Sequence, residues 1–195
     1  IIDLVQTGLS LKRAKRVLYD VSCVGGSVLF VGTLPPMNEL VSRLEGNFPI
    51  HCIHEKWLGG MLTNWRTLKH CIKRLNAIEF LEQHNRLNHL SVLELARIQK
   101  QKLRLRRYLN GVKFMKGLPW IVVLLGRGHN ESVVDECHKL NIPIIGIVDT
   151  ACNAKNFTIF IPCNDDSIYT FSWLVFQLVV AIMQFKVDKN SEFLG

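Results

Sequence analysis

The chain has 195 residues, of which 48% are hydrophobic and 21% are charged. These values fit one globular domain with its own core, and they exclude a disordered chain, a collagen-like chain and a disulfide-stapled miniprotein. The formal net charge is +8, and residues 61–110 hold 11 Lys and Arg against 3 Asp and Glu. That one stretch carries the whole surplus, which indicates a polyanionic partner.

Short apolar runs alternate with helical periodicity over the first 54 residues, a pattern typical of a parallel sheet with crossover helices. The spacing of Leu11, Ala14, Leu18 and Val21 predicts the apolar face of a helix. The expected elements, in order, are a strand at 1–5, a helix around 11–21, a strand at 27–31, a helix at 37–44 and a strand at 50–54.

The alternation lapses after residue 54 for about sixty positions. Between 60 and 110, two amphipathic helices separated by a polar break predict an αα-hairpin. Thr63 or Asn64 is positioned to cap the first helix, and Gly111 ends the second. We expect an α/β domain made of 1–59 and 111–195, with a basic helical hairpin inserted at 60–110.

The α/β pattern then resumes, so the fold class is α/β, a doubly wound parallel sheet with an inserted hairpin. The expected elements are a strand at 120–125, a helix at 131–140 capped by Asn130, strands at 143–148 and 158–161, and a helix from about 166. The uncharged run 168–185 reaches the lower length limit of a membrane span. Polar residues interrupt it, and a core helix is favoured over a membrane-anchored module.

Few residues indicate catalytic or metal chemistry. Gly126-Arg127-Gly128-His129-Asn130 lies where Rossmann-like folds bind phosphate, but its spacing fails the full glycine motif. Because of its position, this loop leaves a nucleotide-binding, flavodoxin-like enzyme as the alternative function. Arg127 could instead contact a phosphate of a nucleic acid. His51, Cys52 and His54 lack the second ligand pair of a zinc site. We expect no catalytic residue, no metal and no cofactor, and we expect the six scattered cysteines to be free thiols.

The basic side chains of the hairpin are the stronger candidate site. Acidic partners are too few for a salt-bridge lattice, although a merely solvated basic face is the alternative. Such a surface binds phosphates without reading bases, which suits a folded RNA. The predicted RNA-binding residues are Lys56, Thr63, Asn64, Arg66, Lys69, Lys73, Arg74, Arg97, Lys100, Lys102, Arg104, Arg106, Arg107, Lys113 and Lys116.

The octet Trp57-Leu58-Gly59-Gly60-Met61-Leu62-Thr63-Asn64 resembles the signature of the small-subunit ribosomal protein S-two family, of bacterial and organellar type. The likeness runs the length of the chain. Further matching segments are Ile1-Ile2-Asp3-Leu4, Leu29-Phe30-Val31-Gly32-Thr33, Gly111-Val112-Lys113-Phe114-Met115, Ile142 to Thr150, and Asn164-Asp165-Asp166.

The resemblance implies a flavodoxin-like domain with a protruding helical hairpin, and a structural, non-enzymatic role in the small ribosomal subunit during translation. It implies a position near the junction of head and body, with small-subunit ribosomal RNA and other ribosomal proteins as partners, and no membrane or small-molecule substrate. The family-motif residues expected to serve the fold are Trp57, Gly59, Gly60, Asp149, Asn164, Asp165 and Asp166. With only six alanines, the composition favours a mitochondrial ribosome over a chloroplast or bacterial one.

Overall fold

A parallel sheet lies at the centre of the computed structural model, which describes residues 2–46, 49–87, 90–126, 131–149, 154–164 and 167–192. Its strands follow the order β2-β1-β3-β4-β5, and every neighbouring pair is parallel. The strands are β1 (Val28–Val31), β2 (Ile50–Ile53), β3 (Ile121–Leu125), β4 (Ile144–Val148) and β5 (Ile159–Pro162). This order is that of the flavodoxin-like fold, which confirms the predicted α/β class.

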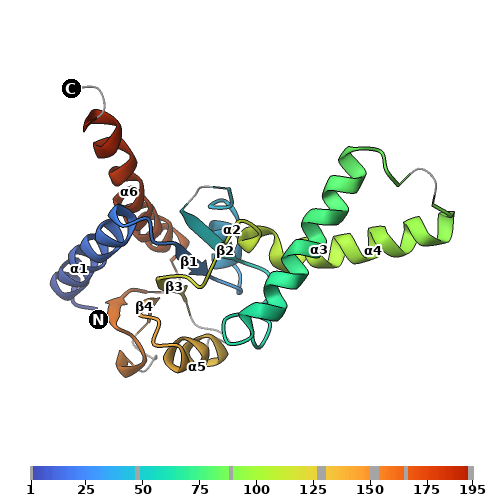
Figure 1. Ribbon diagram of the computed structural model, residues 1–195. Coiled ribbons are helices and arrows are strands. Elements are labelled where there is room, and N and C mark those ends of the chain that lie inside the picture. The colour runs from blue at the N-terminus through green and yellow to red at the C-terminus, as the bar shows by residue number, and fades with distance from the viewer. Residues whose placement is uncertain are drawn as a thin grey trace.

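Helices cover both faces of the sheet (Figure 1). They are α1 (Leu4–Cys23), α2 (Met37–Ser42), α5 (Glu131–Lys139) and α6 (Ile168–Glu192), with short 3-10 turns η1 (Asn110–Val112) and η2 (Ala154–Asn156). Because side chains alternate along a strand, Phe30 enters the core beneath α1 and α6, whereas Leu29 enters the core beneath α5. Both residues are fully buried, as a sheet covered on two faces requires.

The N-terminal strand expected at 1–5 is wrong. Helix α1 begins at Leu4, and the Asp3 carboxylate caps it by accepting a hydrogen bond of 2.9 Å from the backbone N–H of Val5. A short apolar run cannot by itself distinguish a strand from the start of a helix, and here the cap and the following periodicity decide. Helix α1 therefore starts seven residues before the helix expected around 11–21, whereas the other expected strands and helices form within a few residues of their predicted bounds. Asn130 lies outside the described residues.

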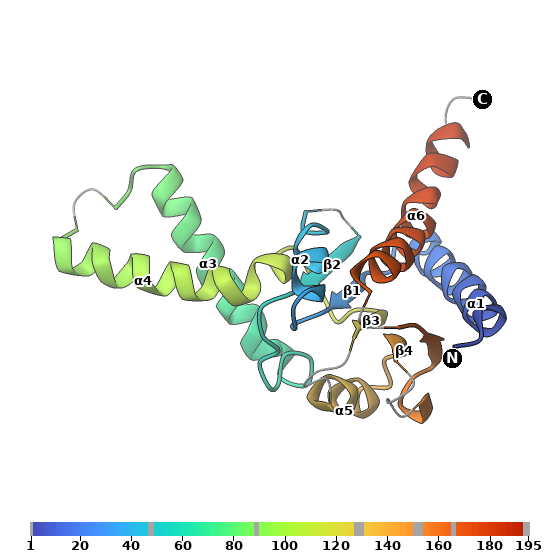
Figure 2. The ribbon, with the colours of Figure 1, turned by 180° about the vertical axis from the view of Figure 1, so that it is seen from behind.

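Helices α3 (Trp65–Gln83) and α4 (Val92–Leu109) pack on each other and extend away from the sheet (Figures 1 and 2). We call α3, α4 and their connection the arm. A capping box starts α4, in which Ser91 and Glu94 satisfy each other's backbone N–H groups. Across the arm, Lys102 forms an ion pair with Glu82, to which Gln99 also donates a hydrogen bond of 3.1 Å.

Helix α6 contributes a large part of the core. Its segment Ile168–Phe185 is long and apolar enough for a membrane span, with a mean hydropathy of 1.7. However, Phe171, Leu174 and Leu178 recur at spacings of three and four residues and are almost fully buried against the sheet. This is the pattern of a helix that packs on a sheet, in agreement with the expected core helix.

Two phenylalanines on α6 provide a matched test of this role. Phe171→Ala should lower the free energy of unfolding by about 3–5 kcal/mol, because it empties a fully buried site. Phe176→Ala removes the same group from a position that is 60% exposed, and should change stability by no more than about 0.5 kcal/mol. Urea unfolding followed by circular dichroism measures both values. Equal losses for the two variants would contradict the packing described.

Candidate nucleic-acid interface

The buried carboxylate of Glu136, on α5, holds the turn that leads into the arm. Its side chain is only 6% exposed. Oε1 accepts hydrogen bonds from the Trp57 indole N–H (2.9 Å) and the Gly60 N–H (2.8 Å). Oε2 accepts from the Leu62 N–H (2.8 Å), the Thr63 N–H (2.9 Å) and the Thr63 hydroxyl (3.1 Å). One ionised side chain therefore satisfies N–H groups ahead of α3 that have no partner within the helix.

The structure does not show the side-chain cap that was expected from Thr63 or Asn64 at the start of α3. The Thr63 hydroxyl donates to Glu136 instead of capping α3, and Asn64, which directly precedes the helix, makes no side-chain capping bond. Gly60 has a φ of +86°, in the left-handed region that favours glycine, so the turn needs a glycine there. Sequence reasoning missed Glu136. The available signal was its position three residues after the apolar Val133 and directly before Cys137, on the buried side of α5.

The environment of Glu136 keeps it ionised. Burial acts to raise the pKa of this carboxyl, since it disfavours the charged form. Hydrogen bonds from Thr63, Trp57, Leu62 and Gly60 outweigh that effect, and the pKa lies below its ordinary value. The carboxylate is thus charged at neutral pH and acts as an acceptor only, matched to the donors around it.

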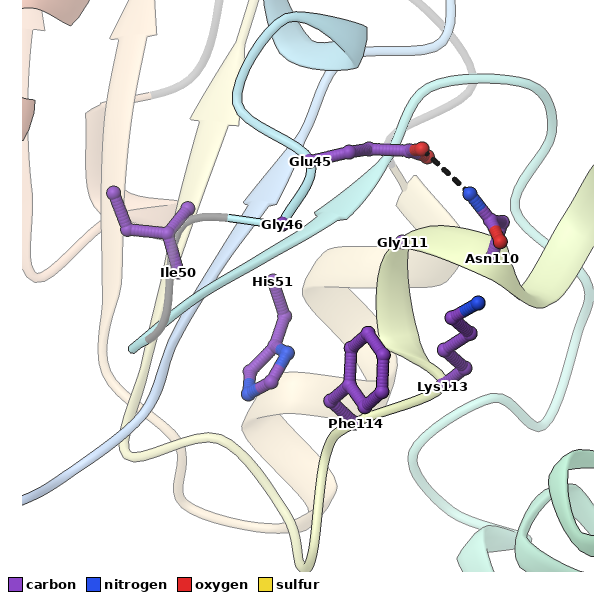
Figure 3. Close-up of a pocket in the computed structure, with 8 residues that line it drawn as sticks. All are labelled: Glu45, Gly46, Ile50, His51, Asn110, Gly111, Lys113 and Phe114. Carbon is purple, nitrogen blue, oxygen red and sulfur yellow. Dashed lines mark hydrogen bonds between the residues drawn. The ribbon is translucent and has the colours of Figure 1, made fainter. Parts of the chain in front are cut away.

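The return from the arm is fixed by close packing against β2. A Cβ atom on Gly111 would lie 2.2 Å from the carbonyl oxygen of Cys52, so only glycine fits this approach. The neighbouring Asn110 side chain donates a 2.7 Å hydrogen bond to Glu45 (Figure 3). A cavity of about 310 Å³ opens beside this contact, with Glu45, Asn110 and Phe114 in its lining. Both ends of the arm are therefore attached to the sheet domain.

The surroundings of His51 and Cys52 do not favour metal binding. Burial first, and the charge of Glu45 second, raise the pKa of Cys52 to about 12, so its thiol stays protonated. Burial also lowers the pKa of His51. Among the described residues, no group of three His, Cys, Asp or Glu side chains is placed to hold a metal ion.

The structure divides the predicted RNA-binding side chains into ion-paired and unpaired groups. Lys102 pairs with Glu82, Arg107 Nε lies 2.9 Å from a Glu55 carboxylate oxygen, and Lys113 Nζ lies 3.5 Å from Glu79. These three cations are partly neutralised. Of the remaining Lys and Arg side chains in the predicted set, Arg106 has a charge interaction with Glu82. The others, all exposed, are Lys56, Arg66, Lys69, Lys73, Arg74, Arg97, Lys100, Arg104 and Lys116.

Six of these cations form two rows of equal spacing. Residues three and four apart share one side of a helix. The α3 row consists of Arg66, Lys69 and Lys73, and the α4 row consists of Arg97, Lys100 and Arg104. Within the part of the chain that the structure describes, no acidic side chain pairs with any of the six.

The remaining predicted residues lie apart from the arm. Asp149 follows β4 and Asn164 follows β5, so both lie at the carboxyl edge of the sheet. Gly126 follows β3 with a φ of +73°, and its N–H donates to Ile147. Arg127 and the rest of the candidate phosphate loop, together with Asp165 and Asp166, lie outside the described residues.

The fold and the arm define the class of protein: a doubly wound α/β domain with a helical arm that carries the surplus charge. Residues 1–184 match the family described as Ribosomal protein S2, and the chain belongs to this family. It is 39% identical over 184 residues to the small ribosomal subunit protein uS2 of Synechococcus sp. (strain JA-2-3B'a(2-13)), covering 94% of this chain and 70% of that one.

Two further relatives carry similar names. The chain is 37% identical over 185 residues to the small ribosomal subunit protein uS2c of Oltmannsiellopsis viridis, covering 94% of this chain and 77% of the relative. It is 38% identical over 190 residues to uS2c of Cyanidium caldarium, covering 97% and 78%. The expected family is thereby confirmed, and the alternative of a nucleotide-dependent enzyme has no support in these names.

Replacement of Glu136 by glutamine should weaken the attachment of the arm. Glu136→Gln keeps the shape but turns an N–H group toward the backbone donors, and should lower the free energy of unfolding by about 2–4 kcal/mol. Asp135→Asn is the matched control, because the neighbouring Asp135 is exposed. Chemical denaturation of both variants measures the difference, and a Glu136→Gln value equal to the control would refute the role assigned to the carboxylate.

The same contact predicts how stability depends on pH. A carboxyl whose pKa is lowered by folding stabilises the native state fully above its unfolded pKa, and this contribution is lost as the pH falls through the folded pKa. The stability difference between the wild type and Glu136→Gln should be largest at neutral pH and shrink as the pH falls below the ordinary value of 4.5. Urea unfolding from pH 7 to pH 3 tests this, and a constant difference would count against it.

Proposed function

We propose that this chain is a structural constituent of the small ribosomal subunit that binds small-subunit ribosomal RNA through the arm. Membership of the Ribosomal protein S2 family supports the proposal. The observation that carries the RNA-binding part is the exposed α3 row of Arg66, Lys69 and Lys73, which has no acidic partner among the described side chains. Unpaired, exposed cations can exchange their counterions for RNA phosphates at little cost in desolvation.

The sheet domain and the arm are proposed to have different roles, because their charges differ. The sheet domain, 1–59 with 111–195, has no surplus charge, and residues 60–110, which include the arm, supply the basic surface. The contacts of Glu136 and the close packing of Gly111 support a fixed arm direction, which lets the arm present its cations at a distance from the sheet. A rigid, shape-matched surface suits folded RNA, in which phosphates and 2′-hydroxyls are the accessible groups.

We propose that the ion-paired cations contribute less to RNA binding than the unpaired ones. Lys102, Arg107 and Lys113 would have to leave Glu82, Glu55 and Glu79 before they could contact phosphate fully. Thr63 is engaged through its hydroxyl with Glu136 and is assigned to the fold instead of to RNA. The strongest phosphate contacts are therefore assigned to the unpaired residues.

The proposal also covers the position of the chain in the small subunit and the cellular compartment of its ribosome. The family resemblance supports a position near the junction of head and body, in contact with neighbouring ribosomal proteins. We place the chain on an organellar or bacterial ribosome, and the low alanine content supports a mitochondrial one. Fractionation of cells that express the tagged chain tests the compartment, and recovery with chloroplast or cytoplasmic ribosomes would correct it.

Charge reversal of the α3 row tests the RNA contact. Arg66→Glu, Lys69→Glu and Lys73→Glu together should weaken association with small-subunit RNA and make the log–log salt dependence shallower by about 2, since three phosphate contacts are lost. Filter binding from 50 to 300 mM salt measures the slope, and sedimentation measures incorporation into the small subunit.

A control on the sheet domain separates local contact from net charge. Lys12→Glu, Arg13→Glu and Arg16→Glu make the same change in total charge at exposed positions of α1. This variant should keep the wild-type salt slope. Equal effects of the two triple variants would mean that only net charge matters, and an unchanged slope for the α3 variant would show that its row does not face RNA.

A further inference from the structure

Helices α1 and α6 lie side by side on one face of the sheet, at the end of the molecule opposite the arm (Figures 1 and 2). The outer side of α6 carries four large apolar side chains at spacings of four, three and four residues, which places them along one side of the helix. These residues, the α6 stripe, are Tyr169 (86% exposed), Trp173 (55%), Phe176 (60%) and Val180 (37%). The core packing of α6 uses the opposite side of the helix, so the stripe faces outward.

A continuous apolar stripe of this length indicates a contact surface. Single exposed apolar residues are ordinary on a protein surface, whereas contiguous ones mark interaction sites. Tyr and Trp are also enriched among the residues that carry most of the binding energy in protein interfaces. On α1, Leu4 is 80% exposed and Leu9 is 55% exposed, which adds aliphatic surface to the same layer of helices.

Gly8 leaves α1 open to close approach. A Cβ atom on Gly8 would have no described atom within 4 Å, and this residue has no positive φ, so neither packing within the chain nor backbone geometry calls for glycine. Glycine inside a helix lowers its stability relative to alanine. Gly8 lies two turns before Lys15, on the same side of α1, and Lys15 Nζ donates a 2.9 Å hydrogen bond to Gln177 Oε1 on α6. The border between the two helices therefore has room for the backbone of a partner.

The charges beside the stripe lie on one side of it. Lys12 shares a side of α1 with Lys15 and Arg16. Among the described side chains, no ion pair joins any of the three to a carboxylate. The segment 168–185 of α6 has no charged residue. A partner that complements this surface is apolar in the middle and acidic along one edge, which is the pattern of an amphipathic helix with Asp and Glu at spacings of three and four.

RNA and a lipid surface fit these observations less well than a protein does. Nucleobases stack on rings, and the aliphatic side chains of Leu4, Leu9 and Val180 offer no ring face. A helix that lies on an anionic bilayer carries Lys and Arg along its own polar side. Helix α6 has neither from 168 to 185.

We propose that the outer side of α1 and α6 docks an amphipathic helix of a protein partner. Its apolar side lies on the α6 stripe, its backbone passes close to Gly8, and its Asp and Glu side chains face Lys12 and Arg16. The inference goes beyond the proposed function, because this face is not part of the RNA contact. The chain can thus hold a protein at one end while the arm at the other end contacts RNA.

Site-specific photo-crosslinking in living cells tests the assignment. The full chain, expressed in its own cells, carries p-benzoylphenylalanine in place of Tyr169, the most exposed member of the stripe, or in place of Asp135, which is exposed on α5 across the sheet. The probe at Tyr169 should capture a protein segment that mass spectrometry identifies as acidic and apolar at helical spacing. The probe at Asp135 should not capture that segment.

Substitutions on α1 then link the capture to the proposed contacts. Lys12→Glu with Arg16→Glu should lower the crosslink from position 169 about tenfold, whereas the exchange Lys12→Arg with Arg16→Lys keeps both charges and should preserve it. Gly8→Gln should also lower the crosslink, because it fills the space left by glycine. It should not lower the free energy of unfolding, since glutamine favours a helix more than glycine does.

Four results would overturn the inference. They are capture of RNA, lipid or a second copy of the chain at position 169, no capture at that position, capture of the same segment at position 135, and a crosslink that the charge reversal leaves unchanged. Failure of the wild-type chain to co-sediment with the small subunit would instead overturn the proposed function, whatever the probe at Tyr169 captures.

Discussion

The hydrogen bonds that Glu136 accepts from the turn before α3 determine how the arm leaves the sheet domain. A buried carboxylate is stable only if its charge is matched, and here an indole N–H, backbone N–H groups and a hydroxyl provide that match. The same contact satisfies the N–H groups of a turn that could not otherwise be buried. The turn and the carboxylate therefore depend on each other, and the direction of α3 depends on both.

The return from the arm is fixed by a different physical means. No charge is buried at Gly111, where the absence of a side chain lets the backbone approach Cys52 closely. Asn110 adds a hydrogen bond to Glu45 beside it. The start of the arm is thus held by hydrogen bonds to a buried charge, and its end is held by steric fit. The arm has little core of its own. Its position relative to the sheet is defined because it is attached at both ends, by two independent interactions.

Local ion pairs refine what the net charge implies. Three of the basic side chains at the arm and its root are paired with glutamates, two of which belong to the arm itself. The charge that remains unpaired is concentrated in the rows on α3 and α4, and only the α4 row borders an apolar groove. A basic region that is continuous in the sequence is in this way separated into two rows with different surroundings.

Much of this molecule follows from local sequence. The alternation of apolar runs and helical periodicity predicted the parallel sheet, and residue counts alone located the charge on 61–110. The strand expected at 1–5 was wrong because the four apolar residues on either side of Asp3 are too few to show a period, so the Asp3 cap decided in favour of a helix. Only the tertiary structure identified Glu136, whose partner Gly60 lies 76 residues away in the sequence. It alone also paired Arg107 with Glu55 and separated the two rows of cations. Periodicity is a property of neighbours in the chain, whereas the partner of a buried charge depends on how distant segments pack.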